Sequence, residues 1–195
     1  EKFVADGGTL ITGFMSGIVD QSDNVHLGGY PGPLRKLCGV WAEEIDALAP
    51  GQQNSLRFPD GFTTPCSLLC DILHLEGAEA LAHYGEDFYA GTPAVTRNHF
   101  GSGTVYYVGT QPDEAGLARV LGLLAETAGV RPLLPEETPL EVTRRVKDGK
   151  EYLFLLNFTQ ASQPVPASFA GETDCITGSP VPETLPPYGV LLIRR

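Results

Sequence analysis

Three prolines, Pro132, Pro135 and Pro139, separate two stretches of the chain that have different hydrophobic patterns. The stretch before them mixes strand-like runs with an amphipathic helix, whereas the stretch after them contains only short strand-like runs. Proline has no backbone N–H and cannot continue a helix or a central strand, so this spacing is typical of a linker. With 195 residues the chain is long enough for one sizeable domain or two small ones. The pattern therefore predicts one domain over residues 1–134 and a second over residues 135–195.

The first domain reads as mixed α/β. Its beginning is predicted to be the last turn of a helix closed by Gly7 and Gly8, so we expect the chain to start inside a larger domain. A short apolar run bounded by glycines, residues 9–14, predicts a buried strand directly after it. The other elements expected here are a short helix at 31–37, an edge strand at 40–45, a turn-rich connection at 51–61, strands at 66–75 and 78–83, and a hairpin with arms at 93–98 and 104–109. The apolar pattern at 66–75 also allows a helix, but a strand is favoured.

The clearest helix of the chain precedes the proline-marked linker. Asp113 and Glu114 favour its N-terminus, because acidic groups interact well with the positive end of the helix dipole, and Gly129 closes it. The apolar residues between them recur with helical spacing, which predicts an amphipathic helix. These residues are Leu117, Val120, Leu121, Leu124, Ala125 and Ala128.

The second domain reads as all-β. Strands at 141–146 and 151–158 flank Asp148-Gly149, a dipeptide that favours a tight hairpin turn because both turn positions need positive φ. Several short strands in a small domain indicate an antiparallel sandwich. The later strands are predicted near 165–169, 172–177 and 188–194.

The chain is acidic, with a formal net charge of −11. Most of the excess lies in residues 1–134, which carry seven Lys and Arg against sixteen Asp and Glu. Such a surface repels phosphate groups, so we expect no nucleic-acid partner and no attraction to anionic membranes. No apolar run approaches the roughly 20 residues that a membrane helix needs.

Four cysteines, Cys38, Cys66, Cys70 and Cys175, are too few for a disulfide scaffold in a chain of this length. We expect reduced, structural thiols and a cytoplasmic protein. Cys66 and Cys70 are the one close pair, and His74 alone would not complete a zinc site with them. No metal or other cofactor is therefore predicted.

A long glycine-rich connection follows the predicted strand at 9–14. It contains Ser16-Gly17-Ile18-Val19-Asp20 and, further on, Gly28-Gly29-Tyr30-Pro31-Gly32-Pro33-Leu34-Arg35. In α/β sheets, ligands and partners collect in such loops beyond the strand ends. This connection is therefore the candidate functional segment of the chain. Its candidate residues are Ser16, Asp20, His26, Tyr30 and Arg35.

Seven stretches of the chain are distinctive in combination: 7–9, 16–20, 27–35, 88–98, 101–109, 152–159 and 185–190. Together they resemble the C-terminal region of bacterial glycoside hydrolase family 42 β-galactosidases. Members of that family combine a catalytic (β/α)8 barrel, a flavodoxin-like trimerisation domain related to class I glutamine amidotransferases, and a small β-sandwich. The resemblance implies that residues 1–134 are the second half of the trimerisation domain and that residues 135–195 are the sandwich.

The same resemblance implies a homotrimeric parent enzyme that hydrolyses terminal non-reducing β-D-galactosides with retention. Its two catalytic glutamates and its galactoside site lie on the barrel, and a barrel of roughly 250 residues does not fit into this chain. We therefore expect no catalytic, cofactor-binding or metal-binding residue here. The expected role is trimer assembly and structural support. The candidate loop is then a structural cap held by Pro31 and Pro33, a trimer contact, or a wall near the active site of the neighbouring subunit.

No local group replaces the barrel carboxylates. Glu43 and Glu44 are adjacent and would point to opposite faces of a strand, while Asp20 and Asp23 lie in a polar loop. Amidotransferase chemistry would need a cysteine at a sharp strand-to-helix turn, and none of the four cysteines has that sequence context.

The alternative function is a free-standing carbohydrate-binding or interaction module. It requires exposed aromatic side chains on one sheet face of the second domain. Tyr152, Phe154 and Phe158 alternate along the strand and share a face, but we interpret that stripe as core. This interpretation favours the β-galactosidase fragment over the module.

Overall fold

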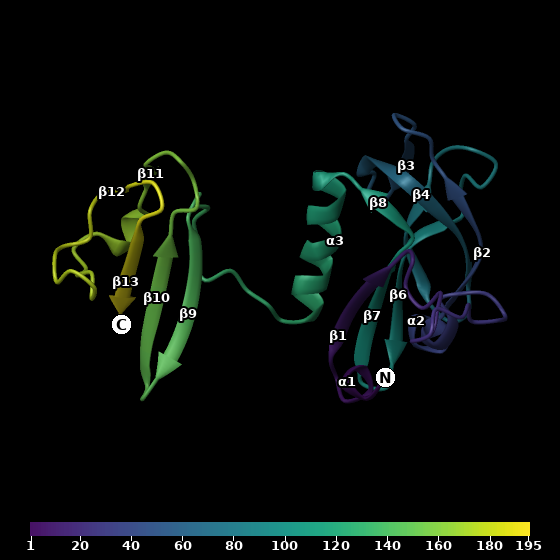
Figure 1. Ribbon diagram of the computed structural model, residues 1–195, viewed down its shortest axis with the longest axis horizontal. Helices are drawn as coiled ribbons and strands as arrows, with labels where there is room; N and C mark the ends of the chain where they lie inside the picture. The colour runs from purple at the N-terminus through teal and green to yellow at the C-terminus, as the bar shows by residue number, and fades with distance from the viewer. The chain divides into compact units, whose positions relative to one another are not determined.

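The computed structural model describes residues 1–195 and divides them into two compact units, Glu1–Val130 and Arg131–Arg195. Figure 1 shows helices beside a large sheet in the first unit and a smaller set of strands in the second. Each unit has hydrophobic core residues of its own. No helix combines the length and the apolar character needed to cross a bilayer.

One eight-stranded sheet forms the first unit. The strand order is β1-β7-β6-β5-β3-β4-β2, and β8 pairs with β4 outside this path. β1 and β7 run parallel, whereas all other pairs are antiparallel, so the unit is a mixed α/β fold. The strands are β1 (Thr9–Gly13), β2 (Val40–Ala47), β3 (Asn54–Arg57), β4 (Thr63–Leu75), β5 (Glu79–Tyr84), β6 (Pro93–Phe100), β7 (Gly103–Val108) and β8 (Thr110–Pro112).

Helices lie on both faces of this sheet. The Tyr106 hydroxyl of β7 reaches the Thr127 hydroxyl of α3 (Glu114–Thr127) at 2.6 Å. The next residue, Tyr107, points to the opposite face, because successive strand residues alternate, and it packs in the cluster that contains Leu37 and Val4. The helices of that second face are α1 (Lys2–Ala5), η1 (Gly32–Leu34) and α2 (Arg35–Cys38).

Local sequence signals explain where two helices begin or end. Asp113 caps α3, because its carboxylate accepts a hydrogen bond from the Gly116 N–H at 2.8 Å. Gly39 ends α2 in the left-handed region, with φ 64°, where a side chain would be strained. The predicted edge strand at 40–45 is confirmed as β2, which ends the strand order.

One prediction for this unit is wrong. The sequence indicates only a turn-rich connection at 51–61, but this segment contains β3, which pairs with both β4 and β5. Its Asn54 and Leu56 are buried. The polar residues of β3 carry no local strand pattern, so its pairing with strands distant in sequence must hold it in place.

The second unit contains a three-stranded antiparallel sheet, β13-β10-β9, and a two-stranded pair, β11-β12. The predicted hairpin is confirmed: Asp148 and Gly149, between β9 and β10, have φ values of 53° and 72°. The elements are β9 (Glu141–Lys147), β10 (Lys150–Leu156), β11 (Gln163–Pro164), η2 (Ala167–Phe169), β12 (Thr184–Leu185) and β13 (Val190–Arg194).

Two strands predicted after the hairpin are wrong. Residues 167–169 form the 3-10 helix η2 instead of a strand. Residues 172–177 turn around Asp174, whose buried carboxylate accepts a hydrogen bond from the Leu192 N–H at 3.0 Å. An aspartate that binds nearby N–H groups favours a turn over a strand. The predicted strand at 188–194 is confirmed as β13.

The core of the second unit lies on the face opposite to the predicted one. Leu153 and Leu155 of β10 are buried with Phe169 of η2, whereas Tyr152 and Phe154 are only half-buried. Phe158, the third residue of the predicted core stripe, lies beyond β10 and is exposed. Helix η2 and strand β12 pack against the face of β10 that carries Leu153 and Leu155, so these leucines form the core and the aromatic residues of β10 do not.

Candidate functional site

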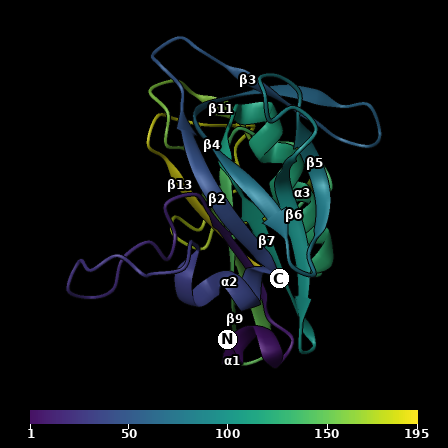
Figure 2. The same ribbon diagram turned by 90° about the vertical axis from the view of Figure 1, so that its right-hand side faces the viewer.

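The candidate loop, defined here as residues 14–31, joins β1 to η1. Figure 2 shows it extending away from the sheet. Its two arms are joined by a bridge between Val19 and Val25 and by a hydrogen bond from the His26 N–H to the Ile18 carbonyl at 2.9 Å. At its base Gly17 lies so close to the Pro31 carbonyl that a Cβ would overlap it. The loop therefore has a defined, closed base that only glycine permits.

Three of the predicted site residues shape the loop locally. Ser16 accepts a hydrogen bond from the Thr12 hydroxyl at 2.8 Å. The exposed Asp20 carboxylate accepts from the Ser22 and Asn24 N–H groups, at 2.7 and 3.0 Å, and these bonds hold its pKa below the usual range. His26 contributes its backbone N–H to the loop, as described above. No side-chain hydrogen bond joins any of the three to Tyr30 or Arg35, so the five residues do not converge on one point.

Tyr30 anchors the loop in the interior of the first unit. Its hydroxyl donates to one oxygen of Asp71 on β4, and the Tyr107 hydroxyl donates to the other oxygen at 2.8 Å. Asp71 has no solvent-exposed surface. Burial raises the pKa of Asp71 to about 6, although both tyrosine hydrogen bonds act in the opposite direction. Burial and the neighbouring carboxyl also raise the pKa of Tyr30, which therefore remains a donor.

The raised pKa predicts a pH-dependent stability. Between the unfolded value of 3.8 and the folded value of about 6, the folded chain holds a proton on Asp71 that the unfolded chain releases. The free energy of unfolding therefore falls as the pH rises through this window, by about 3 kcal/mol. Denaturant unfolding of the native chain and of Asp71→Asn at pH 4, 5, 6 and 7 isolates this contribution. An identical pH dependence in both proteins would contradict it.

Arg35 forms a second anchor at the surface. Its Nε donates to Glu76 at 2.6 Å, its Nη2 donates to the other Glu76 oxygen, and its Nη1 donates to the Gly28 carbonyl at 2.9 Å. The guanidinium also lies over the Trp41 ring, 5.4 Å from the centroid. Both charged side chains remain over a third exposed, so the pair contributes little to stability and mainly orients the end of the loop.

The two arms of the loop present apolar side chains to solvent. We define the contact surface as Met15, Val19, Val25 and Leu27. Leu27 is 96% exposed and Val25 is 63% exposed. A projecting loop with a fixed base and several exposed aliphatic residues has the character of a protein-contact element.

Sequence reasoning missed the residues that hold the loop: Asp71, Tyr107, Glu76 and Trp41. For Asp71 a signal exists, since it is the one charged residue within the apolar run from Leu69 to Leu73. A charged residue in a buried strand requires partners. Nothing local identifies those partners as Tyr30 and Tyr107, because they come from distant parts of the chain.

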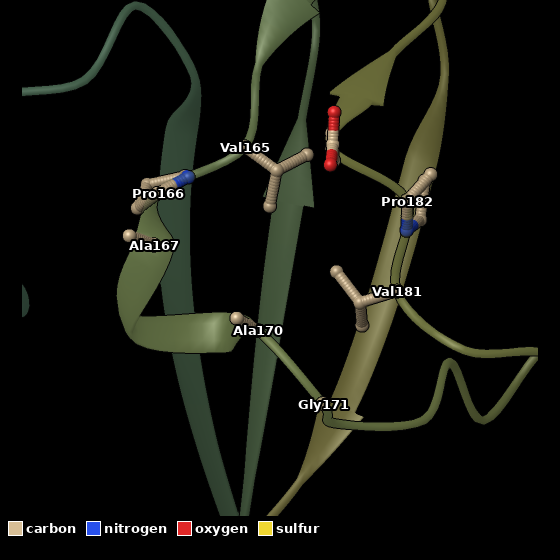
Figure 3. A pocket seen from close by; sticks show the side chains of 8 residues that line it. Val165, Pro166, Ala167, Ala170, Gly171, Val181 and Pro182 are labelled. Atoms are coloured by element: carbon tan, nitrogen blue, oxygen red, sulfur yellow. The ribbon is translucent and has the colours of Figure 1, made fainter.

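A separate cleft lies in the second unit. It has a volume of about 450 Å³ between residues 165–171 and 181–183. Figure 3 shows Val165 and Val181 pointing into the space between these segments. The lining consists of small aliphatic side chains and prolines together with Glu183, without an aromatic side chain on which a sugar ring would stack. This cleft therefore gives no support to a carbohydrate site.

The described geometry is that of a mixed α/β unit with an anchored projecting loop, followed by a small β unit. The family model for the β-galactosidase trimerisation domain matches residues 1–131, and the model for the β-galactosidase C-terminal domain matches residues 140–195. The chain therefore belongs to the family 42 β-galactosidases and represents their trimerisation and C-terminal regions.

Individual relatives agree with this assignment. The chain is 52% identical over 162 residues to a β-galactosidase of Planococcus sp., covering 80% of this chain and 24% of that protein. It is 40% identical to a β-galactosidase of Lactobacillus acidophilus, covering 99% of this chain and 29% of the relative. The crystal structure of a β-galactosidase from Bacillus circulans sp. alkalophilus superimposes with a TM-score of 0.88 at 45% identity, covering 100% of this chain and 30% of that one. The chain thus spans less than a third of the length of these relatives.

Proposed function

We propose that this chain is the non-catalytic assembly region of a β-galactosidase that hydrolyses terminal non-reducing β-D-galactosides with retention. The observation that carries the proposal is the division of the chain between two non-catalytic regions, residues 1–131 and 140–195. A catalytic barrel needs roughly 250 residues, so the groups that bind and cleave the galactoside belong to the remaining length of the protein. The proposed partners of this chain are that barrel and further copies of itself.

We propose that residues 1–134 complete a flavodoxin-like domain, related to the amidotransferases, and that residues 135–195 form the β-sandwich. The edge strand β1 pairs on one side only, in parallel with β7. Beside it, Leu117 and Leu121 of α3 remain 45% and 43% exposed, although the helix pattern marks them as apolar-face residues. A cleft of about 320 Å³ between β1 and α3 is lined by Ile11 and Leu117. Further parallel strands and helices in the whole protein would cover this edge and face.

We further propose a homotrimer in which the contact surface of the candidate loop packs against a neighbouring subunit. The exposed aliphatic residues favour burial at an interface, and the anchors at Tyr30 and Arg35 hold the loop in place for it. A cytoplasmic location fits the four free thiols, one of which, Cys175, is exposed.

The test of the loop is a pair of substitutions on its second arm. Val25→Asp with Leu27→Asp, made in the whole protein, is expected to convert the trimer to smaller species, because charged side chains would lose hydration at the interface. Analytical ultracentrifugation measures the mass, and release of galactose measures activity. Ile176→Asp, at a similarly exposed residue of the second unit, is the control and should leave the trimer intact. Unchanged mass and activity in the double variant would exclude the loop as a subunit contact.

A further inference from the structure

In strand β4 a β-bulge separates Cys66 from Cys70. In the pairing with β8, Cys66 lies opposite Pro112 and Cys70 lies opposite Thr110. Four residues along β4 therefore cover the same length of the sheet as two residues along β8. Leu68, inside the bulge, has φ 72° and is 53% exposed. The chain bulges outward at Leu68, and this brings the two cysteines together.

The register of β4 and β8 also indicates how far apart the Cα atoms of the two cysteines lie and which face of the sheet their side chains share. Residues two apart on a strand lie on the same face with Cα atoms about 6.6 Å apart. Because their partners are two apart, Cys66 and Cys70 share a face at about this separation, which lies near the upper limit of the roughly 4.4–6.8 Å usual for disulfides, so closing the S–S bond requires the bulge to draw the two Cβ atoms together. Both thiols are buried in the same core cluster, and Cys70 Sγ lies 3.8 Å from the Thr110 hydroxyl.

The two thiols differ in their surroundings. The neighbouring Cys66 lowers the pKa of Cys70 to about 7, against the effect of burial, and the Tyr89 hydroxyl acts in the same direction as Cys66. The neighbouring Cys70 and burial both raise the pKa of Cys66. Cys70 is therefore the better nucleophile, since the thiolate is the reactive form of cysteine.

A polar cleft lies next to this pair. Its volume is about 490 Å³, and its lining includes Asp46, Asn54, Glu86 and Tyr89. The Tyr89 hydroxyl donates to Asp46 at 2.6 Å, and its ring belongs to the core cluster that contains Cys70. Tyr89 therefore borders both the cleft and Cys70, and the cleft is the side from which a small polar oxidant would approach the thiol.

We propose that Cys66 and Cys70 form a dithiol site that hydrogen peroxide oxidises to a disulfide within strand β4. The Cys70 sulfur attacks one peroxide oxygen, the O–O bond breaks, and the leaving hydroxide takes a proton to become water. The resulting sulfenic acid on Cys70 is attacked by the Cys66 sulfur. The S–S bond forms, the S–O bond breaks, and hydroxide leaves with the Cys66 proton as a second water. The two thiols lose two electrons, and one peroxide becomes two waters.

Peptide mapping of the whole native protein tests the proposal. The protein is treated with hydrogen peroxide, the peroxide is removed with catalase, and the unfolded chain is blocked with N-ethylmaleimide and cut with trypsin. Residues 58–97 form one tryptic peptide that contains Cys66 and Cys70 and no other cysteine. Most of this peptide should carry no N-ethylmaleimide and be two hydrogen masses lighter than the unblocked reduced peptide. Reduction with dithiothreitol before blocking should restore two thiols that N-ethylmaleimide blocks. The lone buried Cys38 should remain fully blocked. Two blocked thiols in peptide 58–97, under conditions that oxidise the exposed Cys175, would overturn the proposal.

Single substitutions test which thiol attacks. In Cys66→Ser the sulfenic acid on Cys70 has no partner and should be trapped by dimedone, whereas Cys70→Ser should leave Cys66 without a dimedone adduct. An adduct on Cys66 in Cys70→Ser, equal to that on Cys70 in Cys66→Ser, would contradict the assignment of Cys70 as the attacking group. The wild-type peptide map requires no substitution and stands even if a variant does not fold.

Discussion

Replacing Asp71 by alanine is expected to lower the free energy of unfolding by about 2–4 kcal/mol. The substitution leaves the hydroxyls of Tyr30 and Tyr107 without their shared acceptor, and each buried unpaired hydroxyl costs about 1–3 kcal/mol. Loss of the buried charge offsets part of this cost at neutral pH. Trp41, the single tryptophan of residues 1–195, lies in the same unit, so its fluorescence in denaturant reports the transition.

Asp71→Asn is the matched control. The asparagine amide accepts a hydrogen bond through its oxygen and donates one through its nitrogen, and a tyrosine hydroxyl can take either role. Both tyrosines thus keep a partner, and we expect a loss below about 1 kcal/mol. Equal losses in the alanine and asparagine variants would show that the tyrosine hydrogen bonds do not stabilise the base of the loop. Faster proteolysis within residues 14–31 of the alanine variant would link the buried anchor to the order of the loop.

Leu155→Ala is expected to destabilise the second unit by about 2–5 kcal/mol, because a fully buried leucine leaves a cavity when it is truncated. Phe158→Ala removes a larger side chain but one that is 67% exposed, and it should change stability by no more than about 0.5 kcal/mol. Far-UV circular dichroism in denaturant measures both, since the second unit contains no tryptophan. A larger loss for Phe158→Ala than for Leu155→Ala would place the core on the aromatic face that the sequence pattern favours.

Signals confined to a few neighbouring residues predicted their structures correctly. Asp148-Gly149 needs positive φ at both positions, and Asp113 lies at the N-terminus of the long helix, which it caps. Each of these depends on backbone geometry or on a hydrogen bond within three residues. The family resemblance is also confirmed, because it depends on many such stretches in combination.

Features set by distant partners were not predictable. β3 is a strand because β4 and β5 flank it, although three of its four residues are polar. The aromatic stripe of β10 is half-exposed because η2 and β12 cover the other face. The sequence selected Tyr30 in the candidate loop and Arg35 just beyond it for their position after a strand. Their partners, Asp71 and Glu76, lie about forty residues further along the chain. Ser16, Asp20 and His26 looked equivalent to them in sequence and instead shape the loop locally.

The free edge of strand β1 and the exposed apolar residues of helix α3 have one common explanation. Both the free edge of β1 and the exposed apolar residues of α3 would be unfavourable in a finished domain, since an open strand edge and apolar helix residues invite non-native association. Both are explained if more of the polypeptide packs there. The proposed assembly role therefore requires a natural protein that is longer than these 195 residues and supplies the polypeptide that covers β1 and α3.

The most direct test of this account is the mass of the natural polypeptide, measured by immunoblot of a denatured source extract with an antibody raised against residues 1–195. The account predicts a single species several times heavier than the 20.9 kDa of this chain, in line with relatives of which it covers 24–30%. A natural species near 20.9 kDa would contradict it, because no catalytic barrel would then accompany these two units.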